Sequence, residues 1–161
     1  MIIGMGTGRC GTVSLAEWLD VSHEHKTLIE NEYLSELNGH DKAQWLIELA
    51  VQQRRHNRNR GDVSLDHINN LDYWLDQKDV TLIAVMRDRE ETVQSIKNYR
   101  TQRIWQKLFP QFDFQNEESI GRYWDWYYDT MIENQDKIII ISPEQIPIIR
   151  NEGKHAETKE S

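Results

Sequence analysis

The first fourteen residues of the chain constrain its fold more than any other stretch. They read MIIGMGTGRCGTVS, a short aliphatic run followed by a turn rich in glycine. Glycines let the backbone turn tightly and leave N–H groups exposed, and a helix that follows directs the positive end of its dipole at the same point. This pattern predicts a buried strand, an anion-binding turn and a helix that begins near Gly11.

Residues 6–13 are the candidates for contact with the anion, and Arg9 adds a charge that does not titrate. The candidates are Gly6, Thr7, Gly8, Arg9, Cys10, Gly11, Thr12 and Val13. The nucleoside-triphosphate loop G-x-x-x-x-G-K-[ST] has the glycine spacing of Gly6 and Gly11. In this chain, however, Thr12 and Val13 occupy the places of its lysine and its magnesium-binding hydroxyl.

A second motif follows the aliphatic run at residues 80–86, whose composition is typical of a strand buried on both faces. Arg87 comes directly after that run, and Ser95 lies eight residues further on. Asp88 and Glu91 form a capping-box pattern, which predicts a helix start between them. Arg87 is therefore expected at the carboxyl end of a strand, where open α/β sheets bind ligands.

The two motifs together resemble those of sulfotransferases that use 3′-phosphoadenosine 5′-phosphosulfate (PAPS). The order Gly-Arg-Cys-Gly-Thr resembles the 5′-phosphosulfate loop of that family, and residues 87–95 are similar to its motif R-[DN]-P-x-x-x-x-x-S, with Arg89 in place of the proline. The resemblance implies that Arg9 acts on the 5′-phosphate, that Arg87 and Ser95 bind the 3′-phosphate, and that no metal is needed. A family loop of the type G-x-x-G-x-W-K has no match in the chain.

The resemblance also implies a general base, for which relatives use a Glu after the second strand or a His after the third. Glu24 is the first candidate here, and Asp62 is the second. His23 or His25 would orient the carboxylate of Glu24 and tune its pKa.

Further candidate strands at residues 21–29, 61–64 and 137–141 alternate with helical patterns, which predicts a mainly five-stranded parallel sheet. We expect a P-loop-like, three-layer α/β/α fold, with one domain over residues 1–150 and a disordered polar tail over 151–161. The first helix should pack Leu15, Trp18 and Leu19 on the sheet, and residues 117–134 should form an aromatic core helix.

Composition restricts the partners. A formal net charge of −8 argues against nucleic acid, and the single cysteine, Cys10, excludes an internal disulfide. No long apolar run or signal peptide is present, so no membrane contact and a cytoplasmic location are expected. A small molecule, a carbohydrate or a peptide would accept the sulfuryl group, and the oligomeric state stays open.

Two segments and the function itself each have more than one interpretation. The aromatic segment 100–114 fits an acceptor-binding insertion or lid, or a hydrophobic plug over the sheet. The basic block 54–60 fits a solvated helix end or a clamp for an acidic acceptor. Besides a sulfotransferase, the motifs fit a non-catalytic module that binds PAPS or its product 3′,5′-bisphosphoadenosine (PAP), or a small P-loop nucleotide kinase.

Overall fold

A computed structural model describes residues 1–23, 48, 51 and 54–147 of the chain. Within these residues five strands form one sheet in the order β2-β3-β1-β4-β5, and every neighbouring pair is parallel. The strands are β1 (Ile2–Met5), β2 (Ser22–His23), β3 (Gly61–Val63), β4 (Thr81–Val85) and β5 (Ile138–Ile141). The chain builds the sheet outward on both sides of the central strand β1. In open α/β sheets, ligands bind at the carboxyl ends of the strands where the strand order reverses in this way.

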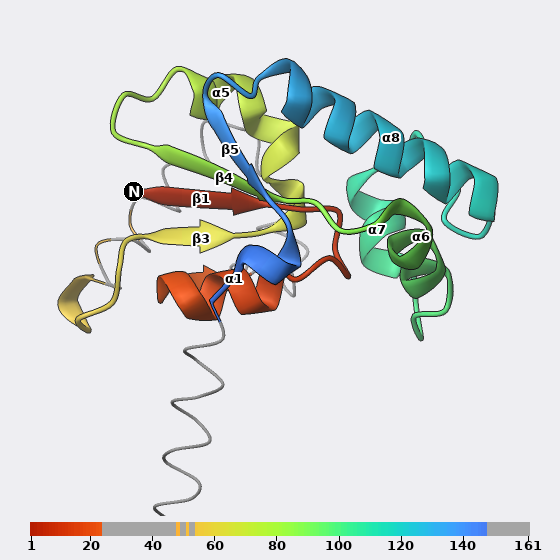
Figure 1. Ribbon diagram of the computed structural model, residues 1–161, viewed down its shortest axis with the longest axis horizontal. Helices are drawn as coiled ribbons and strands as arrows, with labels where there is room; N and C mark the ends of the chain where they lie inside the picture. The colour runs from red at the N-terminus through yellow and green to blue at the C-terminus, as the bar shows by residue number, and fades with distance from the viewer. Residues whose placement is uncertain (24–47, 49–50, 52–53, 148–161) are drawn as a thin grey trace, which may run out of the picture.

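Helices connect these strands. They are α1 (Thr12–Leu19), α5 (Leu71–Leu75), α6 (Arg89–Lys97), α7 (Arg103–Leu108) and α8 (Glu117–Glu133), with 3₁₀ turns η1 (Leu65–Asn70) and η2 (Pro143–Gln145). The carboxyl ends of β1, β3 and β4 point toward the side of the molecule where α6 and α7 lie (Figure 1). No helix in the described ranges is long and apolar enough to cross a bilayer.

Alternation along the central strands produces two cores, one on each face of the sheet. Ile3 of β1 and Ala84 of β4 pack in a cluster with buried residues of α5, α6, α7 and α8. Ile83 and Val85 of β4 pack in a second cluster with Leu15 of α1. Successive strand residues point to opposite faces, so both faces need a helical cover. The expected three-layer α/β/α arrangement and the five-stranded parallel sheet are confirmed.

The bounds of β3, β4 and β5 lie within one residue of the expected ones, while α7 lies in segment 100–114, where no helix was expected. The last helix ends at Glu133, one residue before the expected bound, and three of its tyrosines are completely or almost completely buried. The second strand includes Ser22 and His23, while residues 24–29 of the expected strand lie outside the described ranges. The tail 151–161 also lies outside them, so the domain division stays a prediction.

One packing expectation for the first helix was wrong. Leu15 is completely buried, but Trp18 is 41% exposed. The buried side of α1 is centred between Leu15 and Ala16, and this rotation turns Trp18 away from the sheet.

Candidate functional site

The turn after β1 has an unusual backbone. Gly8, Arg9 and Gly11 all have positive φ angles, of 88°, 57° and 105°. A Cβ on Gly8 would also lie only 2.9 Å from the Trp105 ring, so this position requires glycine. For Arg9 a positive φ is costly, and strain of this kind gathers at ligand sites.

The second half of this turn presents unused donors. Gly11 is the N-cap of α1, and the helix begins at Thr12, as expected. No residue in the described part of the chain accepts a hydrogen bond from the backbone N–H of Arg9, Gly11 or Val13. The first N–H groups of a helix lack intrahelical partners and attract anions. The turn therefore has the donors that a phosphate or sulfate group needs.

The first half of the turn is fixed by tyrosines of α8. The Gly6 N–H donates to the Tyr127 hydroxyl at 3.1 Å, and the Thr7 N–H donates to the Tyr128 hydroxyl at 3.2 Å. Tyr123 donates to the Thr7 carbonyl oxygen at 2.8 Å, as does the Trp105 indole at 2.7 Å. The backbone donors of Gly6 and Thr7 are thus used within the protein.

Cys10 lies beneath the same turn and is completely buried. Burial raises the pKa of its thiol, and hydrogen bonds that include one from Tyr128 offset only part of this effect. The thiol is therefore held in its neutral, unreactive form. Cys10 shapes the turn from below and does not line its open side.

The two sequence motifs meet at Arg9. The Arg9 Nε donates to the Ser95 Oγ at 3.0 Å, and the Arg87 Nη1 donates to the Arg9 carbonyl oxygen at 2.9 Å. Arg87 also forms an ion pair with Glu91 at 3.2 Å. Arg9 of the turn after β1 and Ser95 of α6 are 86 positions apart in the sequence, and this hydrogen bond joins the two motifs.

Arg89, which replaces the proline of the family motif, has a structural contact here. Its guanidinium bonds both carboxylate oxygens of Asp125 in α8, at 2.8 and 3.0 Å. Asp88 caps α6 by accepting from the Glu91 N–H at 3.0 Å, while the Glu91 side chain pairs with Arg87. The expected helix start is confirmed. Of the capping box, the hydrogen bond to the Asp88 side chain is present, while the Glu91 side chain bonds Arg87 instead of the Asp88 backbone.

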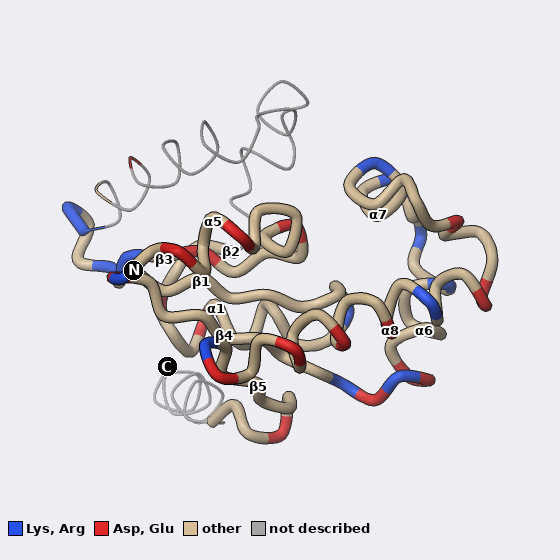
Figure 2. The backbone as a smooth tube through the Cα atoms, turned by 90° about the horizontal axis from the view of Figure 1, so that it is seen from above, with Lys and Arg blue, Asp and Glu red and all other residues tan. Residues whose placement is uncertain are grey.

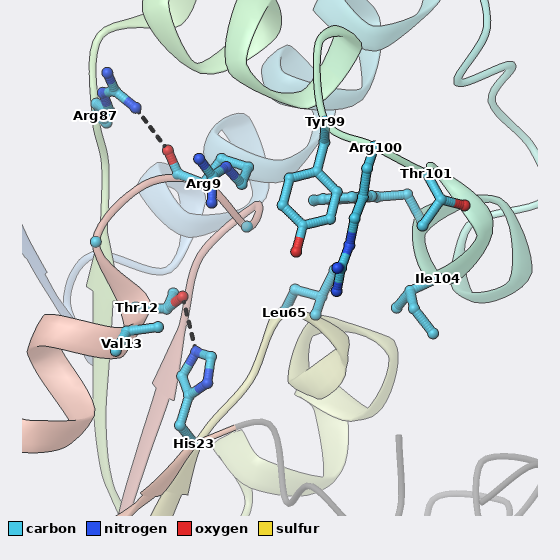
Figure 3. A pocket seen from close by; sticks show the side chains of 13 residues that line it. Arg9, Thr12, Val13, His23, Leu65, Arg87, Tyr99, Arg100, Thr101 and Ile104 are labelled. Atoms are coloured by element: carbon cyan, nitrogen blue, oxygen red, sulfur yellow. Dashed lines mark hydrogen bonds between the residues drawn. The ribbon is translucent and has the colours of Figure 1, made fainter. Parts of the chain in front are cut away.

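A cavity of about 510 Å³ opens at the carboxyl end of the sheet beside this turn. Figure 3 shows Thr12, Val13 and Arg87 on one side of it and Tyr99, Arg100, Thr101 and Ile104 on the other. Its lining residues are Gly8, Arg9, Gly11, Thr12, Val13, His23, Leu65, Arg87, Tyr99, Arg100, Thr101, Ile104 and Trp105. Six of the predicted anion-binding residues are in this set.

The described lining is strongly cationic. It includes three arginines, Arg9, Arg87 and Arg100, and no aspartate or glutamate. The whole chain has a formal net charge of −8, so this local excess of positive charge runs against the overall balance. Charge in a concave site attracts ligands of the opposite sign. The cavity is therefore suited to an anionic ligand.

The candidates for the general base differ in position. Glu24 and His25 lie outside the described residues. Asp62 is 1% exposed and does not line the cavity, because β3 continues past it and its carboxylate pairs with the buried His67 at 2.8 Å and accepts from Ser22. His23 does line the cavity, and its Nε2 lies 3.1 Å from the Thr12 Oγ1.

Sequence reasoning missed the specific residues of the opposite wall. Tyr99, Arg100, Thr101, Ile104, Trp105 and Leu65 were not candidate site residues, although the aromatic segment 100–114 was interpreted as an acceptor-binding insertion or a plug. Phe109 and Phe114 are buried in the core, as a hydrophobic plug would be. Arg100 and Ile104 line the cavity, so the acceptor-binding interpretation stays a prediction. Trp105, an aromatic residue of segment 100–114 to which the sequence analysis gave no specific role, was the signal that could have identified this wall.

The basic block lies at the other end of the sheet. The Ile2 N–H, at the start of β1, donates to the carbonyl oxygen of Arg60 at 2.9 Å. Figure 2 shows the Lys and Arg positions near the N-terminus separated from those of α6 and α7. Arg58 pairs with Asp20 at 3.6 Å. This placement favours the solvated interpretation of the block over an acceptor clamp at the cavity.

In comparisons with known proteins, no protein-family model and no curated protein matches the chain. The fold and the site together describe an α/β protein that has a cationic cavity at the carboxyl edge of its parallel sheet.

Proposed function

We propose that the protein is a sulfotransferase that moves a sulfuryl group from PAPS to an acceptor hydroxyl or amine. The observation that carries this proposal is the convergence of Arg9, Arg87 and Ser95. These residues come from the two motifs that resemble the family. Hydrogen bonds connect Ser95 and Arg87 to Arg9. Arg9 and Arg87 line the cavity, while Ser95 lies behind Arg9 and is not among the lining residues. Neither motif alone would specify a nucleotide with both a 5′- and a 3′-phosphate.

The residues present fit such a ligand. The cavity of about 510 Å³ lies within the range of roughly 300–1,000 Å³ that is typical of small-molecule sites. Its donors are guanidinium groups and backbone N–H groups, which suit phosphate and sulfate oxygens. Arg89, the departure from the family motif, bonds Asp125 and does not line the cavity.

The roles follow from the family resemblance. Arg9 and the N–H groups at the start of α1 would stabilise negative charge on the leaving 5′-phosphate. Arg87 and Ser95 would bind the 3′-phosphate and fix the orientation of the nucleotide. PAPS, when bound, supplies the sulfuryl group. Glu24 stays the first candidate to remove the acceptor's proton, and its expected orienting partner His23 lines the described cavity.

A non-catalytic module that binds PAP or PAPS is the second candidate. It is favoured by one observation: no carboxylate lines the cavity within the described residues. Such a module would bind PAP and transfer nothing. Incubation with radiolabelled PAPS and a panel of phenols, alcohols and amines separates the two candidates, since a labelled product requires the enzyme.

The first prediction concerns Arg87 and tests ligand identity. Arg87→Ala should weaken PAP binding at least about tenfold in calorimetry, because a charge-assisted contact to the 3′-phosphate contributes about 1.5–3 kcal/mol. Adenosine 5′-phosphosulfate lacks that phosphate and should lose much less affinity. Arg122→Ala, on the exposed side of α8, removes the same charge away from the cavity and is the control.

Two results would refute the assignment. Equal losses for the two ligands would mean that Arg87 acts only through the shape of the turn. Stronger thermal stabilisation of the wild type by ATP with magnesium than by PAP would favour a nucleotide kinase.

A further inference from the structure

The wall of the cavity opposite Arg87 is not assigned to the nucleotide phosphates in the proposal above. It comes from the connection between α6 and α7, residues 99–101, and from Ile104 and Trp105 of α7. Figure 3 shows the Tyr99 and Arg100 side chains extending toward Leu65, away from Arg87.

Arg100 supplies a positive charge there that no carboxylate in the described ranges balances. Its guanidinium carbon lies 5.9 Å from the centre of the Tyr99 ring, and that of Arg9 lies 4.9 Å from the same centre. The ring attracts each cation. Arg100 therefore presents a positive charge with which an anionic group of a ligand can pair.

The rest of the wall is apolar and firmly held. Leu65 is 2% exposed and Trp105 is 7% exposed. The Trp105 indole donates to the Thr7 carbonyl oxygen at 2.7 Å, which fixes the ring against the turn. Fixed apolar surface beside a few polar groups is typical of sites for small organic ligands.

We propose that this wall is an acceptor subsite for a small aromatic acid, whose ring packs on Ile104, with the buried Leu65 and Trp105 behind it, and whose carboxylate binds Arg100. The proposal rests on the proposed function, since it concerns the acceptor of the same transfer. The acceptor hydroxyl oxygen forms the new bond to sulfur, and the bond from sulfur to the bridging oxygen of the 5′-phosphate breaks. PAP leaves with that electron pair, and the hydroxyl proton passes to the base.

The test compares 4-hydroxyphenylacetate with 4-hydroxyphenylacetamide, which differ mainly in charge. Binding of each to the PAP-loaded protein is measured by calorimetry, and transfer from PAPS is measured in parallel. The wild type should bind the acid at least about tenfold more tightly than the amide. Arg100→Gln, kept saturated with PAP, should remove this preference. Lys107→Gln, an exposed position of α7 outside the cavity lining, is the matched control.

The outcomes separate the two proposals. Binding of the acid that depends on Arg100, without transfer, would support the subsite and refute the sulfotransferase. Transfer to both phenols with equal efficiency in wild type and Arg100→Gln would support the enzyme and overturn the subsite. Loss of acid preference in Lys107→Gln as well would also overturn it, because the effect would then be one of general charge.

Discussion

At the scale of single residues, Gly6 and Cys10 show how closely the turn is packed. A Cβ on Gly6 would overlap the Cys10 sulfur and lie 3.0 Å from the Thr12 methyl carbon. The sulfur is completely buried, so it has little space to move. The backbone of Gly6 must therefore run directly over the thiol.

Gly6→Ala should lower the free energy of unfolding by about 1–3 kcal/mol, the usual effect of overpacking. Urea denaturation of Gly6→Ala in the wild-type background and in Cys10→Ala measures the coupling between the two positions. The loss should be smaller when the sulfur is absent. Equal losses in both backgrounds would show that the Cys10 contact does not limit this position.

At the scale of elements, α8 supports the turn that follows β1. The Tyr127 hydroxyl accepts from the Gly6 N–H and donates to the Leu65 carbonyl oxygen at 2.8 Å. Burial raises the pKa of Tyr127 well above its ordinary value, so the hydroxyl keeps the proton that it donates. One side chain of α8 therefore links the turn to η1.

Tyr127→Phe should reduce stability by about 1–3 kcal/mol, because it leaves a buried N–H and a buried carbonyl without partners. The change in urea midpoint measures this effect. Tyr99→Phe is the control, since no residue in the described chain bonds the Tyr99 hydroxyl. A Tyr127→Phe protein as stable as Tyr99→Phe would contradict the supporting role.

The Arg89–Asp125 pair connects α6 to α8, and it predicts a pH dependence. Hydrogen bonding from Arg89 lowers the pKa of Asp125 below its ordinary value of 3.8. A carboxyl whose pKa is lowered by folding stabilises the fold above its unfolded-state pKa, and this contribution is lost as the pH falls through the folded-state value. Both side chains are about half exposed, so the contribution should stay below about 1 kcal/mol.

Asp125→Asn should therefore be less stable than the wild type at pH 6, and the difference should shrink as the pH falls below about 4. Urea titrations of both proteins at several pH values measure it. Asp129→Asn, on the same helix without a described ion pair, is the control. A difference that stays constant from pH 6 to pH 3 would exclude the ion pair as its cause.

At the scale of the whole molecule, positive charge lies at two ends of the sheet. The basic block adjoins the start of β1, and the cavity lies beyond its end. Three strand steps separate these ends by roughly 10 Å, before the side chains are counted. That distance exceeds the Debye length of about 8 Å at physiological ionic strength.

Removing positive charge from the basic block, residues 54–60, should therefore change PAP affinity little. Arg54→Gln with Arg55→Gln should leave PAP affinity within about twofold in 150 mM salt, because screening isolates the block. Arg9→Gln with Arg87→Gln changes the net charge equally but should reduce affinity by on the order of a hundredfold. Calorimetry on both double variants makes the comparison. Similar losses would mean that overall charge, not the cavity, determines binding.

The sequence by itself determined the sheet, the helix starts and the neighbourhood of the site. Aliphatic runs, glycine at the first turn and the Asp88 cap act over a few residues, so they can be recognised without tertiary contacts. The alternation of strands and helices then restricted the topology to a parallel sheet. Arg9, Gly11 and Arg87 were placed correctly at its carboxyl edge for the same reason.

Only the tertiary structure decided which residues of that edge face the cavity. Gly6 and Thr7 donate to tyrosines 121 positions away, and Asp62 is turned to His67 inside the core. The opposite wall, with Arg100, depends on how the connection between α6 and α7 packs against the turn. Contacts between segments so far apart follow from the packing of whole helices on the sheet, which no local pattern specifies.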